Sequence, residues 1–173
     1  MNVSRKASWN RAINAVQSLE LNIRWPLLSL KRLDAELWER TPRLIRIREK
    51  ESISDADHLL LQRTVGDAFF WVLGAYEMVR TLDQRCKAKH AGTTRAAHFN
   101  DVKLQVERVR MPLAKLEPAR RHRSFDRSFA SAVLSRGKGY CWRVADGHDI
   151  PFTTLSDQVL SSLLAYRSPE GGA

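Results

Sequence analysis

A long stretch without proline, residues 54–90, is the feature that most limits how this chain can fold. Ser54 and Asp57 have the spacing of a capping box, in which two side chains bond the free backbone N–H groups at the start of a helix. The middle of the stretch is apolar and uncharged. Lys87 and Lys89 put positive charge at the far end, where the helix dipole favours it. The pattern predicts one long helix, buried through its middle and solvated at both ends.

Apolar residues at steps of three and four predict further helices on both sides of this stretch. In the second helix, leucines lie on one face, and Lys31, Arg32 and Asp34 lie on the opposite, polar face. Thr41-Pro42 is expected to end that helix, because proline disfavours helical geometry in the residue before it. The expected helices, besides the long one, are Ser4–Leu21, Pro26–Glu39, residues 98–115, a short one at 125–134, and a last one opening with the capping-box pair Thr154 and Asp157.

Strand patterns are few. Tyr140 to Val144 alternates like a strand, Asp146-Gly147 supplies a hairpin turn, and residues 150–152 are expected to return beside it. Residues 43–50 fit both a strand and a helix pattern, and we expect an extended basic segment there. With 173 residues the chain is long enough for one hydrophobic core. The sequence thus predicts a mainly-α fold: one domain over residues 1–173, a bundle of five or six helices with a long central helix, a small β-hairpin before the C-terminal helix, and a frayed tail at 168–173.

Composition excludes several classes of protein. The two cysteines, Cys86 and Cys141, have neither the number nor the spacing of a disulfide framework or a zinc site. The histidines show no metal-ligand spacing, so no metal and no cofactor is expected. The N-terminal residues lead into no apolar segment of the kind found in secretory signals. No apolar run is long enough to span a bilayer. These observations favour a soluble, cytoplasmic protein.

The positive charge is unevenly distributed along the chain. The formal charge is +10, and residues 1–50 carry 11 Lys or Arg against 5 Asp or Glu, while residues 91–136 carry 10 against 4. Such a field favours an anionic partner, nucleic acid first and an acidic protein second. Arginine suits bidentate contact with phosphate or carboxylate. The residues expected to contact nucleic acid are Arg43, Arg46, Arg48, Arg120, Arg121 and Arg123. The alternative is a solvated basic surface without a specific partner.

Arg85 and His90, near the end of the long helix, are separated by four residues. This spacing resembles the Arg-x(4–6)-His motif of HEPN nucleases, which are helical-bundle ribonucleases. The resemblance implies a general acid or base role for His90 and a phosphate-holding role for Arg85. It departs from the family pattern at Cys86, where a polar residue is common. The same spacing occurs again at Arg143 and His148, so the resemblance covers only these residues and the helical setting.

The sequence leaves the roles of two further residue pairs open. Glu77 and Arg80, three residues apart, are expected to form an ion pair, while a polar pocket with one carboxylate held for acid–base work is the alternative. Tyr140 and Trp142 can stack on bases, but a core position for Trp142 is favoured. The function expected is therefore a non-catalytic binding or adaptor protein. A metal-independent endoribonuclease and a self-associating structural protein are the alternatives, and the oligomeric state stays open.

Overall fold

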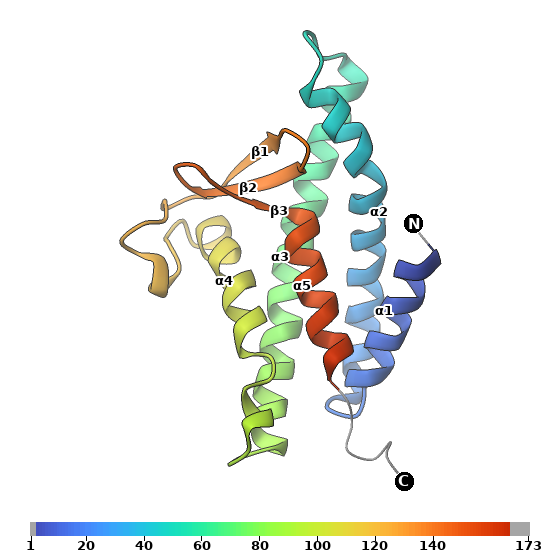
Figure 1. The fold of residues 1–173 in the computed structure, drawn as a ribbon, viewed down its shortest axis with the longest axis vertical. Helices are drawn as coiled ribbons and strands as arrows, with labels where there is room; N and C mark the ends of the chain where they lie inside the picture. The colour runs from blue at the N-terminus through green and yellow to red at the C-terminus, as the bar shows by residue number, and fades with distance from the viewer. Residues whose placement is uncertain (1–2, 167–173) are drawn as a thin grey trace.

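The computed structural model describes residues 3–166, which form a mainly-α single domain with a small antiparallel sheet before the last helix (Figure 1). The helices are α1 (Val3–Val16), α2 (Arg24–Arg48), α3 (Asp55–Lys89), α4 (Asn100–Ala114) and α5 (Phe152–Ala165). The strands are β1 (Ser131–Ser135), β2 (Gly139–Ala145) and β3 (His148–Pro151), hydrogen-bonded in that order. Short 3-10 turns are η1 (Leu21–Ile23), η2 (Thr94–Ala97) and η3 (Arg120–His122). The predicted fold class is confirmed, while the tail predicted at 168–173 lies outside the described residues.

The long central helix is confirmed as α3. Its first turn has the predicted capping box, because the Ser54 hydroxyl accepts from the Asp57 backbone N–H and the Asp57 carboxylate accepts from the Ser54 N–H. The helix ends at His90, whose backbone N–H bonds the Cys86 carbonyl. Trp71 is fully buried in the middle of the helix, and both ends are exposed to solvent. Local signals therefore set both limits of this element.

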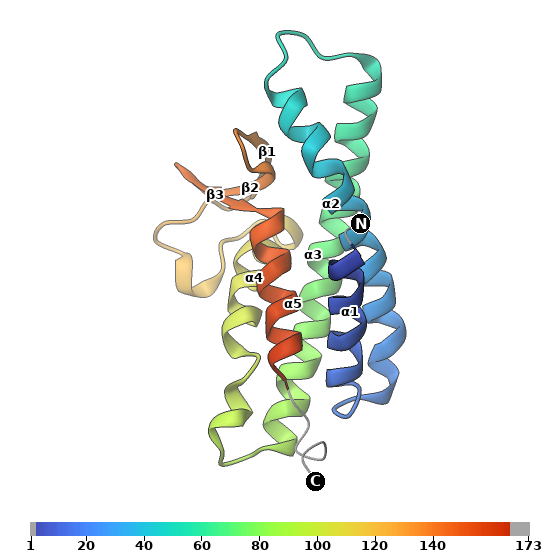
Figure 2. The same cartoon turned by 45° about the vertical axis from the view of Figure 1, so that its right-hand side comes forward.

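The second helix is longer than its sequence indicates. Pro42 lies inside α2, so both the predicted end at Thr41-Pro42 and the extended segment at 43–50 are wrong. Proline removes one backbone hydrogen bond and costs a helix interior about 3 kcal/mol. Leu44 and Ile47, beyond the proline, are 0% and 2% exposed. Burial of these two side chains offsets the cost of the proline, at roughly 1.5–3 kcal/mol each. Helices α2 and α3 consequently run side by side along most of the molecule (Figures 1 and 2).

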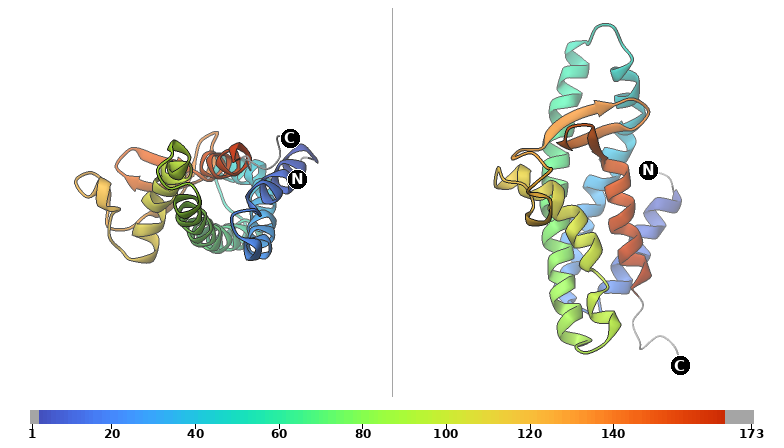
Figure 3. Two further views of the ribbon diagram at one scale, coloured as in Figure 1. Left: turned by 90° about the horizontal axis from the view of Figure 1, so that it is seen from below. Right: turned by 60° about the vertical axis from the view of Figure 1, so that its left-hand side comes forward.

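Helix α5 completes the core. It lies against α3 between α4 and α1, and the sheet sits above its first turn (Figures 1 and 3). The ring of Phe152, the first residue of α5, makes edge contacts with Trp71 of α3 at 5.1 Å and with Trp142 of β2 at 6.4 Å between centroids. This contact fixes the start of the helix at Phe152, preceded by Pro151 in an extended conformation. The predicted capping box at Thr154 is therefore wrong.

The sheet has one strand more than predicted. The hairpin of β2 and β3 is confirmed, with Trp142 opposite Ile150. Residues 131–134, assigned to a short helix from the sequence, instead belong to β1, which pairs with β2 from Ser131 opposite Arg143 to Ser135 opposite Gly139. The predicted helix at 125–134 is thus wrong, because pairing with β2 supplies the backbone hydrogen bonds that a helix would otherwise make.

Two smaller differences concern the N-terminal half. The first helix runs from Val3 to Val16 rather than from Ser4 to Leu21. Asp34, assigned to the polar face of α2, is fully buried. Among residues 3–166, none of the helices has both the length and the apolar character that crossing a membrane requires.

Candidate anion-binding surface

The first predicted cluster lies at the C-terminal end of α2, where Arg43, Arg46 and Arg48 are all exposed. Arg43 donates to the carboxylate of Asp57 at 3.3 Å, and Lys50 donates to the same carboxylate at 2.5 Å. Hydrogen bonds from Lys50 and from the Ser54 hydroxyl hold the pKa of Asp57 far below its usual range, and Arg43 adds to them against the opposing effect of burial. Arg43 therefore stabilises the start of α3, whereas Arg46 and Arg48 have no ion-pair partner among residues 3–166.

A cleft of about 510 Å³ opens beside this cluster, between the end of α2 and the turn that joins β1 to β2. Arg136 from that turn faces Arg48 and Lys50 across it, and Glu49 and Glu51 also line it. Arg48 and Lys50 lie at the end of α2, where the helix dipole is negative, so part of their charge is compensated locally. The cleft thus combines three cationic and two anionic side chains on an exposed edge.

The second predicted cluster, Arg120, Arg121 and Arg123, lies in and beside η3. All three side chains are exposed, and none has an ion-pair partner among the described residues. Ala119, buried before the turn, accepts a 2.7 Å backbone hydrogen bond from His122, which closes η3. This part of the chain projects from the side of the molecule next to α4 (Figures 1 and 3).

The fold keeps the two clusters apart. In Figures 1 and 2 the end of α2 is at one tip of the molecule, whereas η3 lies beside α4, on the other side of the sheet. The six arginines therefore occupy two surfaces, and within residues 3–166 Arg43 alone among the six is engaged in an ion pair.

Arg85 and His90 have separate partners. The exposed Arg85 pairs with Glu20 of the loop before α2 at 3.0 Å. His90, the C-cap of α3, is bonded through Nε2 to the Tyr166 hydroxyl at 3.1 Å. Burial, together with the nearby charges of Arg95 and Lys89, lowers the pKa of His90. The lowered pKa favours the neutral form of His90, and Arg85 and His90 bond to different segments of the chain.

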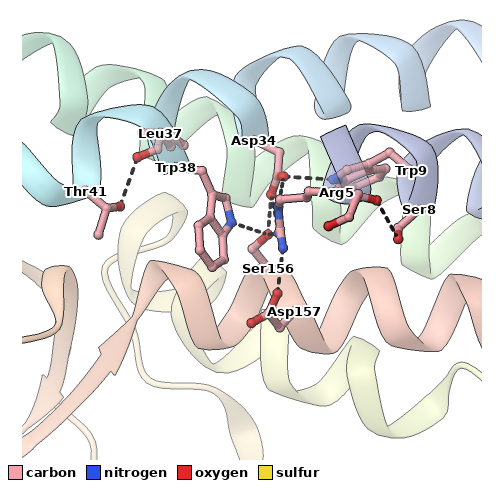
Figure 4. Close-up of polar contacts among 10 residues, drawn as sticks. Arg5, Ser8, Trp9, Asp34, Leu37, Trp38, Thr41, Ser156 and Asp157 are labelled. Atoms are coloured by element: carbon pink, nitrogen blue, oxygen red, sulfur yellow. Dashed lines mark hydrogen bonds and ion pairs between the residues drawn. The ribbon is translucent and has the colours of Figure 1, made fainter. Parts of the chain in front are cut away.

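The clearest buried polar cluster joins α1, α2 and α5 (Figure 4). Asp34 is fully buried and accepts hydrogen bonds from Arg5 Nε at 2.8 Å and from Trp9 Nε1 at 2.8 Å. The Ser156 hydroxyl of α5 donates to the other carboxylate oxygen. Asp34 is thereby bonded on both oxygens, as a buried carboxylate requires.

Arg5 extends this cluster to the surface. Its guanidinium donates to Asp157 at 2.7 Å and lies 4.1 Å from the ring centroid of Trp38, a cation–π contact (Figure 4). Only 11% of the Arg5 side chain is exposed. Every polar group of the cluster has partners within the protein, so its chemistry is that of a clamp between three helices.

Other candidate residues also have structural roles. Glu77 and Arg80 form the expected ion pair at 2.7 Å, and Asp67 pairs with Arg40 of α2 at 2.5 Å. Trp142 is fully buried, which confirms its favoured core position and removes it as a base-stacking surface. Within the described part of the chain, no group of three His, Cys, Asp or Glu side chains is placed to hold a metal ion.

Two aromatic residues went unnoticed in the sequence. Phe125 and Phe129 are 80% and 55% exposed, although the sequence pattern assigned both to the region of a short helix. The available signal was their position among arginines, since aromatic rings interleaved with basic residues are typical of single-stranded nucleic-acid sites.

In comparisons with known proteins, no family model, no curated protein and no solved structure matches the chain. The function must therefore be inferred from the geometry of the chain itself.

Proposed function

We propose that this protein is a non-catalytic binding protein whose exposed arginines contact the phosphate backbone of nucleic acid. The observation that carries the proposal is the division of its charges into two sets. Four buried carboxylates are each held by cations of the protein: Asp34 by Arg5, Asp57 by Lys50 and Arg43, Asp83 by Lys87 and Lys103, and Asp126 by Arg108. Other arginines remain exposed and unpaired among the described residues, five of them being the predicted Arg46, Arg48, Arg120, Arg121 and Arg123.

Unpaired arginines on the surface are free to bind phosphate. A guanidinium presents a planar fork of donors that fits two phosphate oxygens, and it keeps its charge at every accessible pH. The formal charge of +10 attracts polyanions at long range. Because each phosphate contact releases counterions, binding of this kind weakens steeply as the salt concentration rises.

A titration with labelled oligonucleotides tests the proposal. The purified protein should bind at about 50 mM salt and much more weakly at about 200 mM. The double variant Arg120→Ala/Arg121→Ala and the double variant Arg46→Ala/Arg48→Ala should each bind more weakly than wild type. No binding at the lower salt concentration would refute the proposal.

A matched control separates specific surfaces from total charge. Arg24 and Arg63 are also exposed and unpaired among residues 3–166, and they lie outside both clusters. The variant Arg24→Ala/Arg63→Ala also removes two positive charges, and it should bind oligonucleotides nearly as tightly as wild type. If all three double variants lose affinity equally, the arginine clusters have no special role and the proposal fails. An acidic protein as the partner would give no oligonucleotide binding by any variant.

A further inference from the structure

The chain between α4 and β1, residues 115–130, exposes aromatic rings as well as arginines. We call it the Arg/Phe loop. It holds two phenylalanines, Phe125 at 80% and Phe129 at 55% exposure. The same loop holds Arg120, Arg121 and Arg123, which have no ion-pair partner in the described part of the chain. Large aromatic rings are normally buried in a domain of this size, so rings left in water are available to a partner.

The Arg/Phe loop is anchored between these two rings. Asp126 is buried and accepts two hydrogen bonds of 2.8 Å from the guanidinium of Arg108 on α4. The next residue, Arg127, donates its backbone N–H to the Val144 carbonyl of β2 at 2.6 Å. Its side chain pairs with Asp146. The chain is thus fixed to α4 and to the sheet directly after Phe125 and just before Phe129.

The anchoring also leaves the charge of the loop available. Asp126 is neutralised by Arg108, so it does not compete for Arg120, Arg121 or Arg123. Phe125 follows Arg123 by two positions, and both side chains are exposed. A pre-organised loop of this kind loses little conformational entropy when it binds.

We infer that the Arg/Phe loop binds single-stranded nucleic acid, with Phe125 and Phe129 stacking on bases and Arg120, Arg121 and Arg123 holding phosphates. This inference rests on the proposed function and names its substrate class. A phenyl face stacks on any unpaired base, whereas the bases of a duplex are already stacked on each other. A membrane surface fits less well, because insertion requires a continuous apolar face and here an ion-paired aspartate and Arg127 separate the rings.

The test compares three ligands: a fluorescein-labelled single-stranded oligonucleotide of about 15 thymines, an oligouridine of equal length, and a duplex of equal length and mixed sequence. Binding is followed by anisotropy at about 50 mM salt. Wild type should bind both single strands more tightly than the duplex. Phe125→Ala/Phe129→Ala should weaken single-strand binding by about tenfold or more and leave duplex binding unchanged. Phe70→Ala is the matched control, because Phe70 is 63% exposed on α3 and should not affect binding.

The outcomes separate the two proposals. If wild type binds no oligonucleotide, the proposed function fails, and the substrate inference fails with it. If wild type binds but prefers the duplex, or if the phenylalanine double variant binds single strands as tightly as wild type, only the inference on the Arg/Phe loop is overturned. Sedimentation with phosphatidylserine vesicles that depends on Phe125, without effect of that residue on oligonucleotide binding, would also overturn it. Circular dichroism and a thermal melt confirm that each variant is folded.

Discussion

Replacing Asp34 with alanine is expected to destabilise the protein more than any other single change in its polar interior. Asp34 is fully buried and accepts from Arg5, Trp9 and Ser156, which belong to α1 and α5. The substitution leaves three donors without their acceptor. The Arg5 guanidinium, on a side chain only 11% exposed, loses its buried counter-charge.

The size of the effect follows from this geometry. Breaking a buried ion pair by removing one partner costs about 3–5 kcal/mol, because a charge is left buried and uncompensated. Domains are commonly stable by about 5–15 kcal/mol, so the variant loses a large part of its free energy of unfolding. In a chain of this length the melting temperature should fall by about 6–20 °C.

Urea denaturation, followed by tryptophan fluorescence and by circular dichroism, measures this free energy. Asp157→Ala is the control, because Asp157 accepts from the same guanidinium at 2.7 Å but its side chain is 56% exposed. An exposed pair contributes about 1 kcal/mol or less. If the two variants lose equal stability, or if Asp34→Ala loses less than about 1 kcal/mol, the assignment of the cluster as a clamp between three helices is refuted.

Three further outcomes are expected. The pKa of Asp57 is depressed in the folded protein, chiefly by Lys50, so its stabilising effect is present above the unfolded pKa of about 4 and is lost as the pH falls through the folded value. The free energy of unfolding, measured as the pH is lowered below about 4, should therefore fall less in Asp57→Asn than in wild type. Gly139→Ala should lower the free energy of unfolding by about 1–2 kcal/mol, because Gly139 has a positive φ of 73°. It should lower the melting temperature more than Gly147→Ala does, because a Cβ at position 139 lies 3.1 Å from a methyl group, whereas a Cβ at position 147 meets nothing within 4 Å. Wild type and His90→Ala should both leave RNA intact; cleavage by wild type alone would establish the nuclease alternative.

Elements with strong local signals were predictable from the sequence. The capping box at Ser54, the apolar middle and the basic end set the limits of α3, and all three act within a few residues. The hairpin turn at Asp146-Gly147 is equally local. Such features need no knowledge of the rest of the fold.

Elements fixed by distant contacts were not predictable. Helix α2 continues through Pro42 because Leu44 and Ile47 are buried against the rest of the core. Asp34 has the sequence context of a surface residue, yet partners 25 and 122 positions away hold it inside. Strand β1 forms because β2 offers it hydrogen bonds. Periodicity in a short window contains none of this information.

The same division applies to the candidate site. Sequence correctly placed all six arginines on the surface, since long charged side chains are rarely buried. It gave no means of seeing that Arg43 is engaged by Asp57, because that pair depends on how α2 meets α3. The exposure of Phe125 was also hidden, because it follows from the anchoring of Asp126 to α4.

The salt dependence of single-strand binding tests the central claim most directly. Log–log plots of the binding constant against salt concentration have a slope of about −0.7 for each phosphate neutralised on a single strand. Wild type should show a steep slope, and the triple variant Arg120→Ala/Arg121→Ala/Arg123→Ala should show one shallower by about 2. A slope unchanged in the triple variant, or no binding by wild type at low salt, would contradict the claim that these unpaired arginines bind phosphate.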